Sequence, residues 1–356
     1  TINSKIVKKN LIIVFFILFL IKISDAQIGG TSVYKFLDLT NSAKTGALGG
    51  NNVSMYLPDV NLPHYNPALL KPQMDNNLSL NFVTYFAGIK WGYVAYAKDF
   101  ADIGTFTAGI HYINYGKFTE ADELGNKTGE FTAAEYSFDL IWSKPIDSLW
   151  TFGANLKPVY SVLERYTSFG LACDIGVSYY KPSKLFSFGI VAKNIGWQIK
   201  PYYKGHYEKI PFDLQMGVSK KLEHAPFRFS LTAQHLQKPN LNYEMPEDNE
   251  ILIENDLPQT TESWYIKYPE MALRHMIFGL EFLLSKSFAV NIGYNHQRRQ
   301  EMKLTTKSGF TGISWGFSLY LSKFQVEYGR STYHLAGASN LISIKLNFNE
   351  ILVKKM

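Results

Sequence analysis

The feature that most constrains this chain is an alternation of apolar with small or polar residues, sustained over segments of about ten residues. Successive side chains of a strand point to opposite faces, so each such segment is a strand with one apolar and one polar face. In the clearest segment the apolar series is Phe169, Leu171, Cys173, Ile175, Val177 and Tyr179, and the other series is Ser168, Gly170, Ala172, Asp174, Gly176 and Ser178. The pattern returns at 312–321 and 342–348.

Segments of this kind predict fourteen strands, an even number, as a single-chain bacterial barrel requires. They lie near 77–86, 89–98, 104–115, 131–143, 149–163, 168–181, 184–196, 211–222, 226–237, 273–285, 287–296, 310–321, 323–331 and 340–349. The predicted fold is therefore all-β: a 14-stranded antiparallel transmembrane β-barrel over residues 77–349, followed by a tail at 350–356.

The connections between these strands differ in length in a regular way. Barrels of this type keep short turns on the periplasmic side and long loops outside. If the first strand rises from the periplasm, the longer connections at 116–130, 197–210, 238–272, 297–309 and 332–339 lie outside. The short turns near 99–103, 144–148, 182–183, 223–225, 286 and 322 then lie inside.

A soluble β-sandwich also shows alternation, but its second face would form a packed core. Here the face opposite the apolar series mixes glycine with polar and charged residues: Gly109, Gly153, Gly189, Gly217, Gly279, Gly293 and Gly329 with Asn155, Asp213, Gln215, Glu281, Asn291, Gln325 and Glu327. Such a face would leave buried polar groups unpaired in a sandwich. Charged residues are only 19% of the chain, below the roughly 25% of typical soluble domains. Both observations favour the barrel.

The first residues predict a signal peptide over 1–26. Lys5, Lys8 and Lys9 precede the apolar stretch Leu11–Ile21, and Ser24-Asp25-Ala26 is a small-x-small cleavage pattern. A membrane anchor is the alternative, but eleven apolar residues fall short of the roughly 20 that a spanning helix needs. The mature protein would begin at Gln27, in a bacterial envelope.

Charge and motifs exclude several functions. Without four Lys and one Asp of the leader, the net charge drops from +6 to +3, which predicts no nucleic-acid partner. Cys173 is the only cysteine and the eight histidines show no metal-binding spacing, so we expect neither a disulfide, a metal nor a cofactor. No nucleophile elbow or phosphate-binding loop occurs. A surface hydrolase built on Ser339 and His334 would lack a third orienting group, and we expect no enzyme activity.

Residues 27–76 precede the first strand, and we interpret them as a plug in the lumen of the barrel. Tyr34, Phe36 and Leu37, with Leu39 and Ala43, can share one face of a short helix, which Gly49 and Gly50 would end before a strand-like stretch at 53–57. Asn66 can cap a helix whose first turn holds Pro67. The glycines of the inner wall leave room for this segment. The alternative is an ordered periplasmic extension.

The connection at 238–272 is the candidate binding loop, because loops longer than about 15 residues are usually functional or disordered. It combines aromatic and acidic residues, among them Tyr243, Glu247, Asp248, Trp264, Tyr265 and Tyr268. Apolar groups rimmed by charge suit a docking surface. A lid over the barrel mouth explains the same composition equally well.

The N-terminal stretch carries a family resemblance. Gly29-Gly30-x-x-x-Tyr34-x-Phe36-Leu37, Ser42-Ala43, Ala47-Leu48-Gly49-Gly50, Val53, Asp59 and Asn66-Pro67-Ala68-Leu69-Leu70 resemble the PorV/PorQ branch of the FadL-like fourteen-stranded barrels. The resemblance covers the mature chain in architecture, and its specific motifs lie before residue 76. It implies a non-catalytic outer-membrane component of the type IX secretion machinery of the Bacteroidota. It also implies a PorZ-like surface partner, held where cargo is attached to lipopolysaccharide.

Two functions follow as expectations. The first is this anchor, in contact with outer-membrane lipids and lipopolysaccharide. The second is a transporter of hydrophobic small molecules, which a FadL-like fold permits. A transporter needs an apolar pocket that leads to a gap in the wall, whereas the inward faces here are glycine, serine, asparagine and charge. The sequence therefore favours the anchor.

Overall fold

The computed structural model describes residues 32–241, 264–302, 309–321, 323–334 and 337–352. The predicted signal peptide lies outside the described residues, as do Tyr243, Glu247 and Asp248 of the candidate binding loop. Among the described residues, no helix is both long and apolar enough to cross a membrane.

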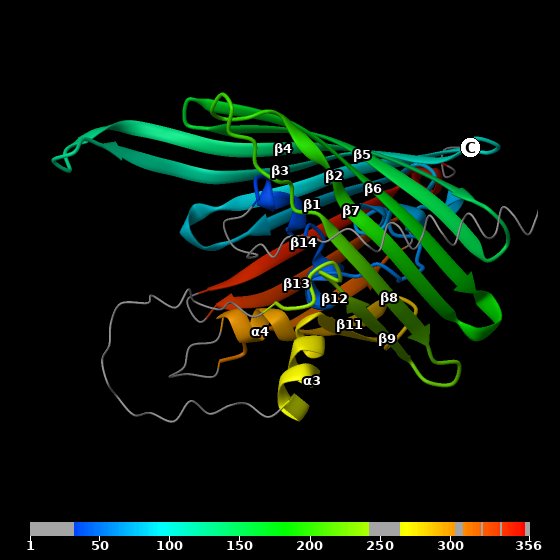
Figure 1. Cartoon of the computed structure of the whole chain (residues 1–356). Coiled ribbons are helices and arrows are strands. Elements are labelled where there is room, and N and C mark those ends of the chain that lie inside the picture. The colour runs from blue at the N-terminus through cyan, green and yellow to red at the C-terminus, as the bar shows by residue number, and fades with distance from the viewer. Residues whose placement is uncertain (1–31, 242–263, 303–308, 322, 335–336, 353–356) are drawn as a thin grey trace, which may run out of the picture.

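The described residues form a closed antiparallel barrel of fourteen strands, as predicted (Figure 1). Each strand pairs with its neighbours in the sequence, and β1 closes the ring by pairing with β14 from Asn77↔Asn347 to Thr84↔Asn340. The strands are β1 Asn77–Thr84, β2 Lys90–Phe100, β3 Gly104–Ala121, β4 Lys127–Pro145, β5 Trp150–Leu163, β6 Tyr166–Lys181, β7 Phe186–Lys200, β8 Asp213–Lys221, β9 Phe227–Ala233, β10 Met276–Phe282, β11 Phe288–Asn295, β12 Ile313–Tyr320, β13 Phe324–His334 and β14 Gly337–Asn347.

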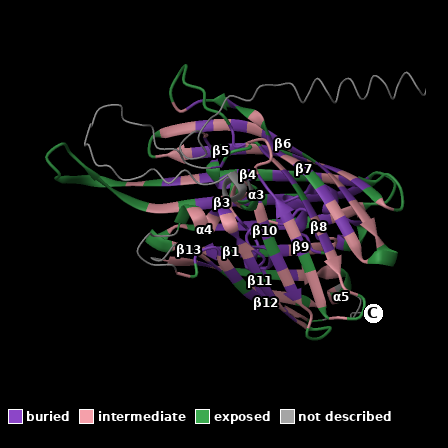
Figure 2. Cartoon of the chain, turned by 60° about the horizontal axis from the view of Figure 1, so that its bottom comes forward, coloured by how far each residue is buried: buried purple, intermediate pink, exposed green. Residues whose placement is uncertain are grey.

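The alternation in the sequence becomes an alternation of exposure along each strand (Figure 2). On β14, Ile342 and Ile344 are 46% and 39% exposed, whereas Ser343 between them is fully buried. Other exposed apolar side chains continue this outer belt: Leu80, Phe82, Val94, Ile110, Phe138, Leu140, Ile175, Ile190, Phe278, Ile292 and Trp315. An apolar surface this continuous does not face water on a soluble protein. The barrel spans a bacterial outer membrane, with its polar residues turned inward.

Two predicted loops are largely strand. The hairpin of β3 and β4 extends past the rest of the wall, so residues 122–126 connect the strands where we expected a loop at 116–130 (Figure 1). Ring stacking of Phe118 on Phe131, with centroids 5.1 Å apart, supports this extension. The Asp122 carboxylate accepts backbone N–H groups of Leu124 and Asn126 and closes the turn. Likewise, β13 reaches His334 and β14 begins at Gly337, inside the loop expected at 332–339.

Short helices lie in some of the other connections and after the last strand. On the side of the long loops, η5 Phe86–Gly88 follows β1, α3 Trp264–Arg274 precedes β10, and α4 His296–Met302 follows β11. We call this side the loop end. At the opposite, turn end, η6 Pro182–Lys184 joins β6 to β7, and α5 Phe348–Leu352 follows β14.

Before Asn66, the N-terminal segment differs from the predicted short helix, ended by Gly49 and Gly50, and the strand-like stretch at 53–57. It holds η1 Lys35–Asp38, α2 Ala43–Ala47, η2 Leu62–His64, η3 Pro67–Leu69 and η4 Pro72–Met74. Tyr34 takes a left-handed conformation at φ 57°, and Leu39 is extended, so helix cannot run through either position. Residues 53–57 form no strand because the closed wall has no free edge to pair with them.

Glycines on the inner wall let the backbone of this segment come close. A Cβ on Gly153, Gly293 or Gly329 would overlap backbone atoms of Pro67, Gly49 or Ala43 respectively. The wall glycines that we interpreted as space are therefore contact points.

Gly293→Val should lower the free energy of unfolding by about 1–3 kcal/mol, because the added methyl groups overpack against the N-terminal segment. Urea unfolding in detergent would measure this change. Ala108→Val is the matched control, since Ala108 lies exposed on the outer face of β3. Equal unfolding midpoints for the two variants would contradict the proposed close approach.

Candidate functional site

The N-terminal segment runs through the lumen from one mouth to the other. At the loop end, Ser32 forms a parallel β-bridge with Lys209, and the Val33 N–H donates to the Lys209 carbonyl at 2.9 Å. At the turn end lies Asp75, two residues before β1 begins. Its carboxylate accepts a hydrogen bond from the Asp99 N–H at 2.9 Å. We call residues 32–76 the lumen segment.

Its elements contact the wall on several sides. α2 contacts β12, β13 and β14, and η3 contacts β4, β5 and β6. Tyr34, Phe36 and Leu37, which sequence reasoning assigned to a plug, are buried in a cluster with Trp91 and Leu341 of the wall. The segment therefore packs as the core of the barrel.

Asn66 and Pro67 lie at the centre of this packing. The Asn66 side-chain oxygen accepts the Ala68 N–H at 3.1 Å and so caps η3, whose first residue is Pro67. The Asn66 amide nitrogen donates to the Val53 carbonyl at 2.9 Å. One side chain thereby holds two parts of the lumen segment together.

Two buried ion-pair groups and one buried histidine–carboxylate hydrogen bond join the lumen segment to the wall. Lys44 contacts Glu281 at 2.5 Å, and Arg228 contacts the same carboxylate. Lys345 contacts Asp59 at 2.8 Å and Glu327 at 2.7 Å. His64 contacts Asp139 at 2.7 Å. Removing one partner of a buried pair leaves an uncompensated charge in a poorly solvated place.

In the first ion-pair group, the pKa of Lys44 depends on two opposing effects: burial and the neighbouring Glu281 carboxylate. Burial by itself would lower this pKa, but the Glu281 carboxylate outweighs burial, and the pKa of Lys44 is raised. The amine therefore stays charged. Sequence reasoning placed Glu281 and Glu327 on the inward face and named Asp59 only as part of the family motif. It did not indicate Lys44, because nothing in the local pattern brings residue 44 beside residue 281.

Around His64 lies a polar and aromatic cluster that the sequence did not indicate. The His64 ring centroid is 5.0 Å from that of Tyr93 and 5.3 Å from that of His111. His64, His111, Tyr93 and Asp139 are almost completely buried. In the described part of the chain, no group of three or more His, Cys, Asp or Glu residues has a geometry that could hold a metal ion.

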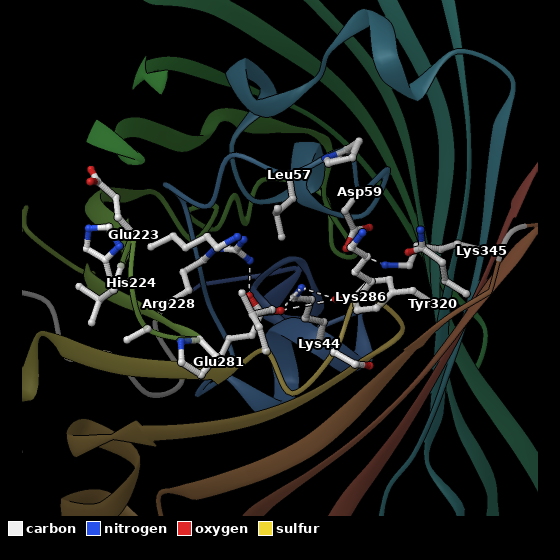
Figure 3. Close-up of a pocket in the computed structure, with 18 residues that line it drawn as sticks. Lys44, Leu57, Asp59, Glu223, His224, Arg228, Glu281, Lys286, Tyr320 and Lys345 are labelled. Atoms are coloured by element: carbon white, nitrogen blue, oxygen red, sulfur yellow. Dashed lines mark hydrogen bonds and ion pairs between the residues drawn. The ribbon is translucent and has the colours of Figure 1, made fainter. Parts of the chain in front are cut away.

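Hollows occur at the turn end and on the outer wall. One of about 650 Å³ opens at the turn end and is lined by charged side chains from the wall and the lumen segment (Figure 3). An apolar hollow of about 340 Å³ lies among outward-facing side chains of β8 to β11, such as Phe229, Phe278 and Ile292. The apolar hollow thus belongs to the membrane side of the wall.

The structure describes only part of the candidate binding loop at 238–272. Trp264, Tyr265 and Tyr268 belong to α3, which contacts α4, and an ion pair of 3.0 Å between Glu270 and Arg274 links successive turns of α3. Ser339, the nucleophile considered for a surface hydrolase, is fully buried and donates to the Thr84 carbonyl at 3.4 Å. It does not face the outer surface as that hypothesis requires.

Lys44→Met should destabilise the protein by about 3 kcal/mol, the low end for a broken buried pair, because Arg228 still contacts Glu281. Lys35→Met is the control, since its pair with Asp38 is partly exposed and worth about 0–1 kcal/mol. Urea unfolding would compare the two variants, and limited proteolysis would report release of residues 32–76. A Lys44→Met protein as stable as Lys35→Met would refute the locking role of this pair.

The fold is similar to that of solved outer-membrane transporters. The toluene transporter TbuX of Ralstonia pickettii matches with a TM-score of 0.52 at 11% identity, covering 88% of this chain and 100% of the other. The Pseudomonas putida toluene transporter TodX gives 0.52 at 12% identity, with 91% and 100% covered. A Pseudomonas aeruginosa FadL homologue gives 0.51 at 8% identity, with 90% and 100% covered. No family model and no curated protein matches the sequence. At these identities the likeness shows the fold alone: a fourteen-stranded outer-membrane barrel with a FadL-like architecture.

Proposed function

We propose that this protein is a non-catalytic anchor in the outer membrane that holds a surface partner, in the manner of PorQ in type IX secretion. The observation that carries the proposal is the lumen segment. It runs from the loop end to the turn end and is tied to the wall by the buried pairs of Lys44, Asp59 and His64. A lumen filled in this way supports a fixed scaffold better than a conduit.

The surface partner would dock at the loop end. The β3–β4 hairpin offers one docking surface, because Leu124 at its tip is 87% exposed and Phe118 on its shaft is 41% exposed. Exposed apolar side chains next to charges such as Lys117 and Glu130 are typical of an interface. The connection at 238–272 remains the second candidate. A PorZ-like protein, placed where cargo is attached to lipopolysaccharide, is the partner that the N-terminal motifs suggest.

A transporter of hydrophobic small molecules is the second candidate function. The solved neighbours TbuX and TodX are named as toluene transporters, and the apolar hollow on the outer wall could receive such a solute. Passage through the lumen would require the lumen segment to move, at the cost of its buried ion pairs.

Affinity purification from solubilised outer membranes tests the anchor. We expect a surface protein to co-purify with the wild type, and Phe118→Ser combined with Leu124→Ser to reduce its recovery several-fold, since exposed apolar anchors dominate interfaces. A matched control is Ile103→Ser with Ile146→Ser, two exposed residues at the turn end. Deleting 243–262 tests the other loop in the same assay.

Uptake measurements separate the two functions. For an anchor, proteoliposomes that contain the wild type should admit toluene no faster than empty liposomes. Toluene entry faster than into empty liposomes would favour the transporter, if the Lys44→Met variant increases the rate further. That variant should loosen the lumen segment. Absence of any co-purifying surface protein together with such entry would reject the anchor.

A further inference from the structure

The mouth of the lumen at the turn end contains two adjoining hollows. The first, of about 650 Å³, lies between the β8–β9 turn, the β10–β11 turn and residues 57–59 of the lumen segment (Figure 3). The second, of about 500 Å³, continues along β12 to β14 as far as Asn77 and Glu350. The hollows share five lining residues: Pro58, Lys286, Tyr320, Gln325 and Lys345. We call the two together the turn-end vestibule, and its shape is elongated.

The floor of the vestibule is electrically balanced. Its cations are Lys44, Arg228 and Lys345, and the carboxylates that contact them are Glu281, Asp59 and Glu327. Every one of these carboxylates therefore already has a cationic partner. The floor neither requires a bound cation nor repels an anion.

The rim of the vestibule is cationic. Among the described residues, the turn-end connections from β8 to β13 carry Lys286 and Lys323 and one acidic residue, Glu223, and Lys221 ends the adjoining strand β8. Of these, Lys221 and Lys286 line the first hollow, and Lys286 and Lys323 line the second. Besides the paired Asp59 and Glu281 of the floor, the acidic residues that line the two hollows are Glu223 and Glu350. Positive charge around a concave opening concentrates anions there.

Arg228 extends the positive charge into the vestibule. Its side chain is 14% exposed and lines the first hollow, and a guanidinium group has five N–H donors, so the contact with Glu281 leaves others available (Figure 3). The positive charge of Arg228 also affects the pKa of the buried Lys71. Its ammonium lies 3.2 Å from the centre of the Tyr56 ring, and it has no carboxylate partner among the described residues. Burial and, to a smaller extent, the positive charge of Arg228 together lower the pKa of Lys71 to about 7.

We propose that the turn-end vestibule binds an acidic peptide segment of a periplasmic protein in an extended conformation. Its carboxylates would contact Arg228, Lys221 and Lys286, and then Lys323 farther along. The amide side chains that line the second hollow, Gln73, Asn77, Gln325 and Asn347, can pair with the alternating N–H and C=O groups of a peptide backbone. An elongated, amide-lined space suits a peptide better than a compact solute.

This site is independent of the proposed anchor function. Surface docking concerns the β3–β4 hairpin and the connection at 238–272 at the loop end, whereas the vestibule opens to the periplasm. The protein would thus contact partners on both sides of the outer membrane. Failure of one proposal leaves the other standing.

Fluorescence anisotropy with the purified barrel in detergent tests the vestibule. The probe is a labelled peptide rich in Asp and Glu, and the same peptide with Asn and Gln is its neutral counterpart. We expect binding of the acidic probe that weakens as salt rises, and none of the neutral one. Lys221→Glu combined with Lys286→Glu should weaken binding roughly tenfold, because two attractive charges on the rim become repulsive.

The matched control reverses two turn-end charges outside the vestibule, Lys144→Glu with Lys184→Glu, and should leave affinity within about twofold of the wild type. Neither double variant should change the urea midpoint, which would exclude unfolding as the cause. Equal affinity of the two double variants would overturn the proposal, as would equal binding of the neutral peptide. Tighter binding of polygalacturonate than of the peptide would overturn the assignment to a protein segment.

Discussion

The structure depends on one constraint: a backbone inside hydrocarbon must satisfy its own N–H and C=O groups. Pairing of β1 with β14 closes the ring, so the wall offers no unpaired strand edge to lipid. Strand geometry then assigns one set of side chains to the membrane and the other to the lumen. On β14, Ile342 and Ile344 face lipid while Ser343 and Lys345 face inward. The apolar outer belt is thus a consequence of closure.

The same closure turns the inside into the packed core of the protein. In a soluble domain an apolar core would fill this space, but the inward residues here are glycine, amide and charge. The lumen segment supplies matching groups: its backbone approaches Gly153 and Gly293, and its charged Lys44 and Asp59 meet Glu281 and Lys345. A buried charge is tolerated only with a partner. The wall and the lumen segment therefore depend on each other, and this supports a scaffold.

The two ends of the barrel carry different chemistry. The loop end presents exposed apolar residues on the β3–β4 hairpin, such as Leu124. The turn end presents a cationic rim above a neutral, ion-paired floor, with Lys221 and Lys286 at the opening. This asymmetry is compatible with the proposed partners at the cell surface and in the periplasm. The solved barrels of similar fold share the closed wall.

The sequence by itself determined the number of strands, their order and which side chains face lipid, because a period of two is a local property of each strand. It also placed Asn66 and Pro67 at a helix start, since capping involves residues close in the chain. It could not pair Lys44 with Glu281 or His64 with Asp139, nor show that a Cβ on Gly293 would meet Gly49. Those contacts join residues distant in sequence, and only the closed wall brings them together. It likewise missed the long β3–β4 hairpin, whose extension depends on cross-strand contacts such as Phe118 with Phe131.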